Sequence, residues 1–192
     1  MLANFCVVAA SYLLGSLPTG VWVSRKLVSR DIREMGNGNT GARNVTHMLG
    51  WKAGIFVGMV DFAKAMLSVL IAKGAGVSLS WQMAAGAAAV LGHDFPLLAG
   101  FRGGQGMAAS IGTMAALLTH ETLVGLLIFG LVYLFSRLFD LSAAVGLGTL
   151  AYLVWRSDHP EILLYYTVSI LLTIPLKKLL DCRLRVKKIG IK

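Results

Sequence analysis

The stretch Leu2–Val23 reads LANFCVVAASYLLGSLPTGVWV, an apolar run long enough to cross the ~30 Å hydrocarbon core of a membrane as a helix. Basic residues follow it closely and none precedes it: Arg25, Lys26, Arg30 and Arg33. A secretory signal peptide has its basic residues on the other side of the apolar run. Because positively charged loops stay in the cytoplasm, we predict a transmembrane helix whose N-terminus faces outward.

The composition of the whole chain also indicates a membrane protein. Of its 192 residues, 56% are apolar and only 14% are charged, and the mean hydropathy is +0.72, values outside those of soluble domains. A formal net charge of +9 is compatible with nucleic-acid binding, but the basic residues fall in short gaps between apolar blocks. That distribution is typical of topology signals. We therefore predict one domain, residues 1–192, embedded in the lipid bilayer and not binding nucleic acid.

Further apolar blocks predict an all-α integral membrane protein with about seven transmembrane helices. The expected spans are Leu2–Val23, Ala53–Ala72, Trp81–Ala99, Met107–Thr119, Thr122–Ser136, Leu141–Trp155 and Ile162–Leu176. The last four have only 13 to 15 residues, fewer than the roughly 20 of a standard span. One long helix over Met107–Ser136 is therefore an alternative.

Charge favours seven crossings over six. Seven crossings place 15 of the 18 Lys and Arg residues on one side of the membrane, whereas six would move the basic tail after Leu176 to the other side. The positive-inside bias then puts the N-terminus outside and the C-terminus in the cytoplasm. We expect the tail to be a solvated anchor near anionic lipid headgroups.

Two polar, glycine-rich stretches interrupt the apolar blocks on the predicted cytoplasmic side. The first is Gly36-Asn37-Gly38-Asn39-Thr40-Gly41-Ala42-Arg43-Asn44. Its glycines permit positive φ and close approach to a ligand, while Asn, Thr and Arg supply hydrogen-bond donors, which suits an anion. The second, Gly100-Phe101-Arg102-Gly103-Gly104-Gln105-Gly106, leads into the apolar block that begins near Met107. Backbone amides at a helix start, together with a guanidinium, predict a phosphate-binding site.

A few polar residues lie within or beside the predicted spans. Asp61 and Lys64 are three residues apart and so share a helical face, either as a structural ion pair or as part of a polar site. Residues 15–20, Gly-Ser-Leu-Pro-Thr-Gly, should weaken the end of the first helix, either as a tolerated kink or as a second wall of the site. His93, shortly before the second stretch, is either structural or functional.

The residues offer no evident nucleophile or metal centre. The four histidines fall in separate segments, and there is neither a Gly-x-Ser-x-Gly elbow nor a cysteine beside a base. Cys6 and Cys182 are expected near opposite membrane faces and unpaired. We therefore expect no metal and no cofactor. Two phosphate-binding sites on one face of a membrane protein indicate transfer of a chemical group between two phosphorylated substrates, at least one of them lipid-like.

The order and spacing of these motifs resemble the bacterial acyl-phosphate:glycerol-3-phosphate acyltransferases over about residues 10–115. The matching stretches are Gly15–Pro18, Asp31–Arg33, Gly36–Val45, Leu49–Gly50, Asp61–Lys64, Gly92–Pro96 and Phe101–Gly106. The resemblance implies a seven-span enzyme of the cell membrane (the inner membrane where there are two), with its active site facing the cytoplasm. It would move a fatty acyl group from acyl phosphate to the 1-hydroxyl of glycerol 3-phosphate, the first step of phospholipid synthesis. Because an acyl phosphate is already activated, such an enzyme mainly neutralises phosphates, aligns the reacting groups and stabilises an oxyanion.

The resemblance also implies the site residues. The expected catalytic residues are His93, Arg43 and Asn44. The expected phosphate-binding residues are Asn37, Gly38, Asn39, Thr40, Gly41, Arg102, Gly103, Gly104, Gln105 and Gly106, with Ser16, Asp61 and Lys64 as supporting polar residues. The proton of the attacking hydroxyl would leave through His93 or through a substrate phosphate.

The sequence departs from the family pattern at several of these positions. The family usually has Ser where this chain has Asn37, Thr at Arg43, Arg at His47, and Lys at both Arg102 and Gln105. Its C-terminal motif, built around His and Asn, has no match in this chain. Arg43 is a candidate to replace the missing cations. Two alternatives stay open: an acyltransferase with another acceptor, and a non-enzymatic carrier of lipid phosphates, for which charged residues inside the membrane are the argument.

Overall fold

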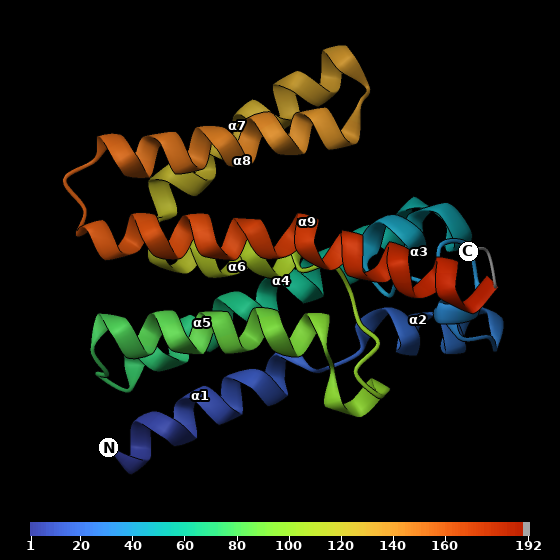
Figure 1. Cartoon of the computed structure of the whole chain (residues 1–192), viewed down its shortest axis with the longest axis horizontal. Helices are drawn as coiled ribbons and strands as arrows, with labels where there is room; N and C mark the ends of the chain where they lie inside the picture. Colours follow the sequence, from blue (N-terminus) through green and yellow to red (C-terminus); the bar gives the residue numbers. More distant parts are fainter. Residues whose placement is uncertain (190–192) are drawn as a thin grey trace.

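The computed structural model describes residues 1–189 as a bundle of helices (Figure 1). The elements are α1 (Leu2–Gly15), α2 (Thr19–Val28), η1 (Ile32–Glu34), α3 (Ala42–Leu49), α4 (Trp51–Gly74), α5 (Leu79–Asp94), η2 (Leu97–Ala99), α6 (Met107–Leu117), α7 (Thr119–Ser136), α8 (Phe139–Arg156) and α9 (Glu161–Ile189). The longer helices run along the long axis, and the two termini lie at opposite ends of it. The short helices α2 and α3 gather at the end where α9 finishes. The predicted all-α architecture is confirmed for this part of the chain.

Four helical segments of the described chain are long and apolar enough to cross a membrane. They are Leu2–Val28, Trp51–Gly74, Thr119–Ser136 and Glu161–Arg183. Many large apolar side chains on the helices are exposed, as Phe135 and Trp155 are. Such exposure is costly in water but expected where lipid surrounds a helix that satisfies its own backbone hydrogen bonds. These features are those of an integral membrane protein.

The first predicted span is broken in the structure. The chain unwinds at residues 16–18, between α1 and α2, because Pro18 has no backbone N–H to continue the helix. The unwinding frees the carbonyl oxygen of Leu17, which accepts a hydrogen bond from Lys64 Nζ at 2.9 Å. A single helix over Leu2–Val23 is therefore wrong, and the break presents polar backbone to α4.

Two other boundaries differ from the prediction. α5 ends at Asp94 rather than Ala99, since Pro96 disfavours helical geometry in the residue before it. α6 and α7 are separated at Leu118, whose φ of −137° and ψ of 62° are not helical. The alternative of one long helix over Met107–Ser136 is therefore wrong.

The start of the basic tail is not a solvated anchor, contrary to the prediction. α9 continues past Pro175 without ending, and the Lys177 side chain is buried, with 6% of the residue exposed. Its Nζ donates to Asp181 and lies 5.1 Å from the centre of the Phe95 ring. The tail therefore packs at Lys177 against the segment that follows α5, whereas the side chain of Lys178 is exposed.

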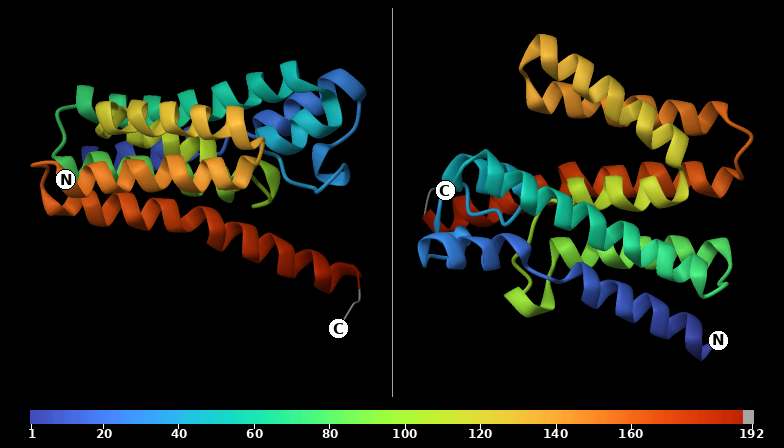
Figure 2. Two further views of the ribbon diagram at one scale, coloured as in Figure 1. Left: turned by 90° about the horizontal axis from the view of Figure 1, so that it is seen from above. Right: turned by 180° about the vertical axis from the view of Figure 1, so that it is seen from behind.

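Small residues let neighbouring helices approach closely, as is common in membranes. A Cβ atom on Gly15 would overlap the backbone of Ala89 in α5, and one on Gly112 would overlap the backbone of α4. Gly125 and Gly146 allow the same close contact between α7 and α8. These two helices form a hairpin at one edge of the bundle (Figures 1 and 2).

Candidate active site

The first glycine-rich stretch folds around the side chain of Asn44, which is only 2% exposed. Asn44 Nδ2 donates to the carbonyl oxygens of Asn39 at 2.8 Å and Met35 at 3.1 Å, with a longer contact of 3.4 Å to that of Ile32. Its Oδ1 accepts from the Asn37 amide at 3.0 Å. One buried amide therefore satisfies backbone groups on both sides of the loop and determines its shape.

The loop backbone uses glycine where the sequence suggested it, with one exception. Gly36 and Gly38 have φ of +53° and +68°, whereas Gly41 is extended, with φ of −77°. The loop is anchored by an apolar cluster that joins α2, η1, α3 and α4. The buried members of this cluster are Val21, Ile32, Val45 and Val57.

Asn39 has a buried donor with no partner. Its Oδ1 accepts from the Gly41 amide at 2.7 Å, while its Nδ2 is buried and forms no hydrogen bond within the described chain. Asn39 also lines a cavity of about 620 Å³. An unsatisfied buried donor is costly, which makes Asn39 a candidate ligand-binding residue.

A buried ion cluster lies beside the break between α1 and α2. Asp61 Oδ1 is 2.8 Å from Lys64 Nζ and 3.4 Å from His93 Nδ1. It also accepts a hydrogen bond from the Thr19 hydroxyl at 3.2 Å. None of the three titratable residues is more than 6% exposed. Charges at this depth need close partners, and the break supplies two of them, the Thr19 hydroxyl and the Leu17 carbonyl.

The second glycine-rich stretch lies directly against His93. The Gly104 amide donates to the His93 carbonyl at 3.0 Å, and a Cβ atom on Gly104 would overlap the imidazole at Nε2. A Cβ atom on Gly103 would overlap the same carbonyl. His93 itself does not line the cavity. The His93 ring therefore lies between Asp61 and the second loop and packs against Gly104 of that loop.

We expect Gly104→Ala to destabilise the protein by about 1–3 kcal/mol, the usual cost of forcing an extra carbon into a packed site. The measurement is thermal unfolding of the purified protein in detergent. Gly130→Ala is the matched control, because a Cβ atom on this α7 glycine meets no atom within 4 Å. Equal melting temperatures for the two variants would contradict the close packing of Gly104 on His93.

Arg33 connects the two loops. It was not predicted as a site residue, although it lies in the matching stretch Asp31–Arg33. Its Nη1 donates to the carbonyl of Ala99, at the start of the second loop, at 2.6 Å. Its Nε and Nη2 donate to the Asp31 carboxylate at 3.0 and 2.7 Å. These hydrogen bonds hold the pKa of Asp31 well below its usual range. The pair is thus ionised at physiological pH and fixes the Arg33 side chain.

Arg102 lies apart from Arg43. It is exposed and lines a smaller pocket of about 370 Å³ together with Asp31, Arg33 and Glu34. Arg43, by contrast, lines the large cavity. The structure therefore places the two predicted phosphate-binding arginines in different pockets.

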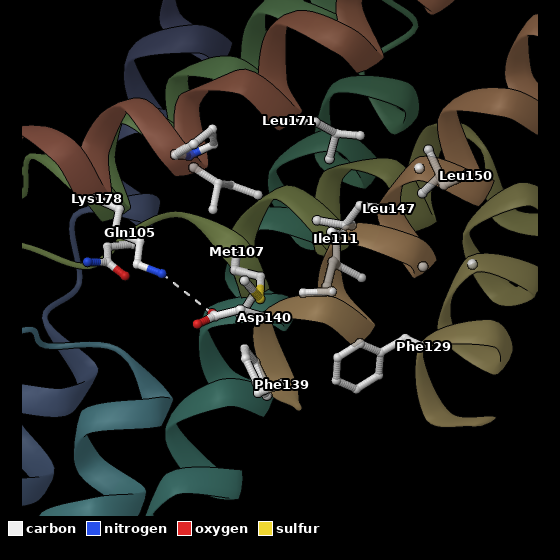
Figure 3. A pocket seen from close by; sticks show the side chains of 18 of the residues that line it. Gln105, Met107, Ile111, Phe129, Phe139, Asp140, Leu147, Leu150, Leu171 and Lys178 are labelled. Atoms are coloured by element: carbon white, nitrogen blue, oxygen red, sulfur yellow. Dashed lines mark ion pairs between the residues drawn. The ribbon is translucent and has the colours of Figure 1, made fainter. Parts of the chain in front are cut away.

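The large cavity has a volume of about 620 Å³ and one polar end (Figure 3). Its apolar wall comes from α6 to α9 and includes Ile111, Phe129, Leu147, Leu150 and Leu171. The polar end is lined by Asn39, Arg43, Asp61, Gln105, Asp140 and Lys178. Figure 3 shows the Lys178 side chain directed toward Asp140, on the side of the view away from Leu150. A cavity of this kind fits a ligand with a long apolar chain and a charged head.

The charges at the polar end are paired with one another. Arg43 Nη1 lies 2.8 Å from Asp140 Oδ1, and its guanidinium is 4.9 Å from the centre of the Phe139 ring. Lys178 Nζ lies 3.5 Å from the same oxygen of Asp140. Asp140 and Lys178 were not predicted as site residues, because one occupied a loop and the other the tail in the sequence pattern.

The remaining predicted residues surround these groups. Thr40 is buried, and Asn37 is exposed. Ser16 is fully buried and packs against α5. Gly106, with φ of +72°, precedes α6, and a Cβ atom there would lie 3.0 Å from Asp94 Oδ1. That oxygen is buried without a hydrogen-bond partner in the described residues.

Comparisons with known proteins agree closely. A family model described as "Glycerol-3-phosphate acyltransferase" matches residues 5–181. Glycerol-3-phosphate acyltransferase 1 of Dehalococcoides mccartyi is 36% identical, over 90% of this chain and 86% of that protein.

Two solved structures share the fold. Both are of PlsY (YgiH), an integral membrane glycerol 3-phosphate acyltransferase, in its glycerol 3-phosphate form and its lysophosphatidic acid form. Their TM-scores are 0.84 and 0.82 at 30% and 28% identity, and each match covers 98% of this chain and 93% of the other. With the same fold, and with a family model that matches most of its length, this chain belongs to the glycerol-3-phosphate acyltransferase family.

Proposed function

We propose that this protein transfers a fatty acyl group from acyl phosphate to the 1-hydroxyl of glycerol 3-phosphate, producing lysophosphatidate and inorganic phosphate. Family membership gives the enzyme class, a membrane glycerol-3-phosphate acyltransferase of phospholipid synthesis. One observation supports the acyl-phosphate donor: the cavity of about 620 Å³ is lined mostly by apolar side chains and includes the cations Arg43 and Lys178. An acyl phosphate has a long apolar chain that fits this wall and an anionic head that complements these cations.

The reaction needs no protein nucleophile. The substrate hydroxyl oxygen forms a bond to the acyl carbonyl carbon, the bond from that carbon to the phosphate oxygen breaks, and the hydroxyl proton leaves with the phosphate. His93 is a poor candidate for the base, because Gly104 covers its Nε2 and Asp61 faces its Nδ1. A phosphate oxygen of the substrate is therefore the favoured proton acceptor.

The polar groups at the cavity have separate proposed roles. Asn39 Nδ2, the buried donor without a partner, hydrogen-bonds the developing oxyanion or a phosphate oxygen. Arg43, with Lys178, neutralises phosphate charge, and Gln105 adds a neutral hydrogen bond. Arg102 remains a proposed phosphate ligand at the smaller pocket.

Other predicted residues act indirectly in this proposal. Asn44 fixes the first loop through its backbone hydrogen bonds. Asp61 and Lys64 hold His93, which in turn supports the second loop. Ser16 and the break that follows it border the cluster of Asp61, Lys64 and His93 on the α1 side, where the Leu17 carbonyl accepts from Lys64.

The proposal extends to the membrane topology. The chain forms a single domain that crosses the cell membrane seven times, through α1 with α2 and through α4 to α9, with its N-terminus outside. Both glycine loops then lie at the cytoplasmic end, beside α2, α3 and the end of α9 (Figure 1). This arrangement keeps most of the basic residues inside and exposes the site to glycerol 3-phosphate, a charged solute that does not cross lipid.

The direct test uses the purified protein in detergent with palmitoyl phosphate. Phosphate release that requires glycerol 3-phosphate, with lysophosphatidate identified by mass spectrometry, is the expected result. Turnover only with a different polyol phosphate would indicate another acceptor. Binding of palmitoyl phosphate without turnover under any condition would favour a non-enzymatic carrier.

Within that assay, Asn39→Asp should lower kcat/KM about a hundredfold, the effect of losing one oxyanion donor. The carboxylate keeps the acceptor for the Gly41 amide but removes the free donor and adds a negative charge. The melting temperature should fall less than in Asn44→Asp: a carboxylate is again buried, but the hydrogen bond from the Gly41 amide is retained. Unchanged kcat/KM would exclude Asn39 from contact with the reacting groups.

A further inference from the structure

We infer that Asp140 is a displaceable counterion. Its carboxylate occupies the position, here called the seat, where the phosphate head of acyl phosphate binds, and the substrate must displace the carboxylate in order to bind. The inference rests on the proposed function. Two cations share one oxygen of this carboxylate, since Asp140 Oδ1 lies 2.8 Å from Arg43 Nη1 and 3.5 Å from Lys178 Nζ. A phosphate oxygen placed at the same point would meet both cations.

The seat is assembled from three helices far apart in the sequence. Arg43 belongs to the first turn of α3, Asp140 to the first turn of α8 and Lys178 to α9. The ring of Phe139 stacks on the guanidinium of Arg43, which restricts its orientation. Figure 3 shows Lys178 directed toward Asp140 at the polar end of the cavity. The apolar chain of the substrate can therefore occupy the cavity while its head occupies the seat.

The carboxylate is weakly held. The side chain of Asp140 is 59% exposed, and those of Arg43 and Lys178 are 48% and 56% exposed. Ion pairs with this exposure are strongly screened by solvent. Among the described residues, Asp140 has no hydrogen-bond donor other than Arg43. A phosphate, which carries more charge and more acceptor oxygens than a carboxylate, can therefore replace it.

Because Gln105 is neutral, the second loop adds no positive charge at position 105 to bind the phosphate head. Gln105 and Lys178 both line the cavity, but Gln105 brings no charge. Positive charge at the cavity thus comes from α3 and α9 rather than from the second loop. Asp140 neutralises part of it in the free protein, so weakly binding anions compete poorly and phosphates are favoured.

Asp140→Asn tests the inference directly. The neutral amide competes less for the two cations, so the KM for palmitoyl phosphate should fall about fivefold. The KM for glycerol 3-phosphate should stay unchanged. Asp158→Asn is the matched control, because Asp158 is an exposed residue of the α8–α9 loop at the other end of α8, and both KM values should stay at wild type.

A binding measurement separates this inference from the proposed function. The dissociation constant of inorganic phosphate, measured by calorimetry, needs no turnover and should fall about fivefold in Asp140→Asn. Lys178→Met should raise both this constant and the KM for palmitoyl phosphate about tenfold. An unchanged phosphate dissociation constant in Asp140→Asn, or a lower KM only for glycerol 3-phosphate, would overturn the inference. Absence of turnover in wild type with the expected phosphate shift would instead overturn the proposed function alone.

Discussion

Asn44→Asp should reduce kcat/KM by about a hundredfold or more and destabilise the protein by about 3 kcal/mol or more. The two side chains have the same shape, so no cavity forms. The substitution replaces an amide donor by a carboxylate oxygen that faces the carbonyls of Asn39, Met35 and Ile32. Each buried carbonyl left without a donor costs about 1–3 kcal/mol, and a buried carboxylate adds repulsion. The first loop then loses the group that shapes it.

Asn37→Asp is the matched control for this stability effect. Asn37 is exposed, and its Oδ1 serves as an acceptor for the Asn39 amide at 3.0 Å. A carboxylate keeps that role, so the melting temperature in detergent should stay close to wild type. If Asn44→Asp unfolds at the same temperature as Asn37→Asp, the buried amide is not what holds the loop.

Asp61→Asn should have the second large effect. It leaves Lys64, which is 4% exposed, with the Leu17 carbonyl but without its carboxylate. Breaking a buried ion pair from one side typically costs about 3–5 kcal/mol. It also replaces the charged oxygen that faces His93 Nδ1 by a neutral amide oxygen, which weakens this contact, and His93 supports the second loop. The melting temperature should therefore fall. The kcat should also fall, by about a hundredfold if the second loop positions the reacting groups.

The double variant Asp61→Asn/Lys64→Met separates structure from catalysis. Replacing Lys64 by Met removes the buried ammonium that Asp61→Asn leaves without a carboxylate. Much of the lost stability should therefore return, because replacing both members of a buried ion pair is often far less destabilising than replacing one. Activity should stay low, because His93 faces a neutral oxygen instead of a carboxylate and the Leu17 carbonyl loses its donor. A stable double variant with wild-type kcat would show that the pair is structural only.

Much of the fold could be predicted from the sequence. The apolar blocks predicted the helices, because a membrane requires long apolar segments with internal backbone hydrogen bonds. Pro18 and its neighbouring glycines predicted a weak point in the first span. The extent of the break was not predictable, since it depends on two residues of another helix: Lys64 donates to the freed Leu17 carbonyl, and Asp61 accepts from the Thr19 hydroxyl.

The candidate site was only partly predictable. The two glycine loops were identified because glycine and polar residues are unusual in an apolar chain. Arg102 and Arg43 looked equivalent in sequence, yet they line different pockets. Asp94, with its unpartnered buried oxygen, gave no signal beyond its place in a matching stretch.

The sequence by itself determined that this protein is helical and membrane-embedded, that it contains two polar glycine-rich loops, and which family it resembles. These properties depend on local features: hydropathy over a helix length, backbone freedom at glycine, and the order of short motifs. Only the tertiary structure decided which groups meet. Arg43 is 97 residues from Asp140, and Arg33 is 66 residues from Ala99. Contacts across such separations are set by how helices pack, through the small residues at their crossings, and no local pattern encodes them.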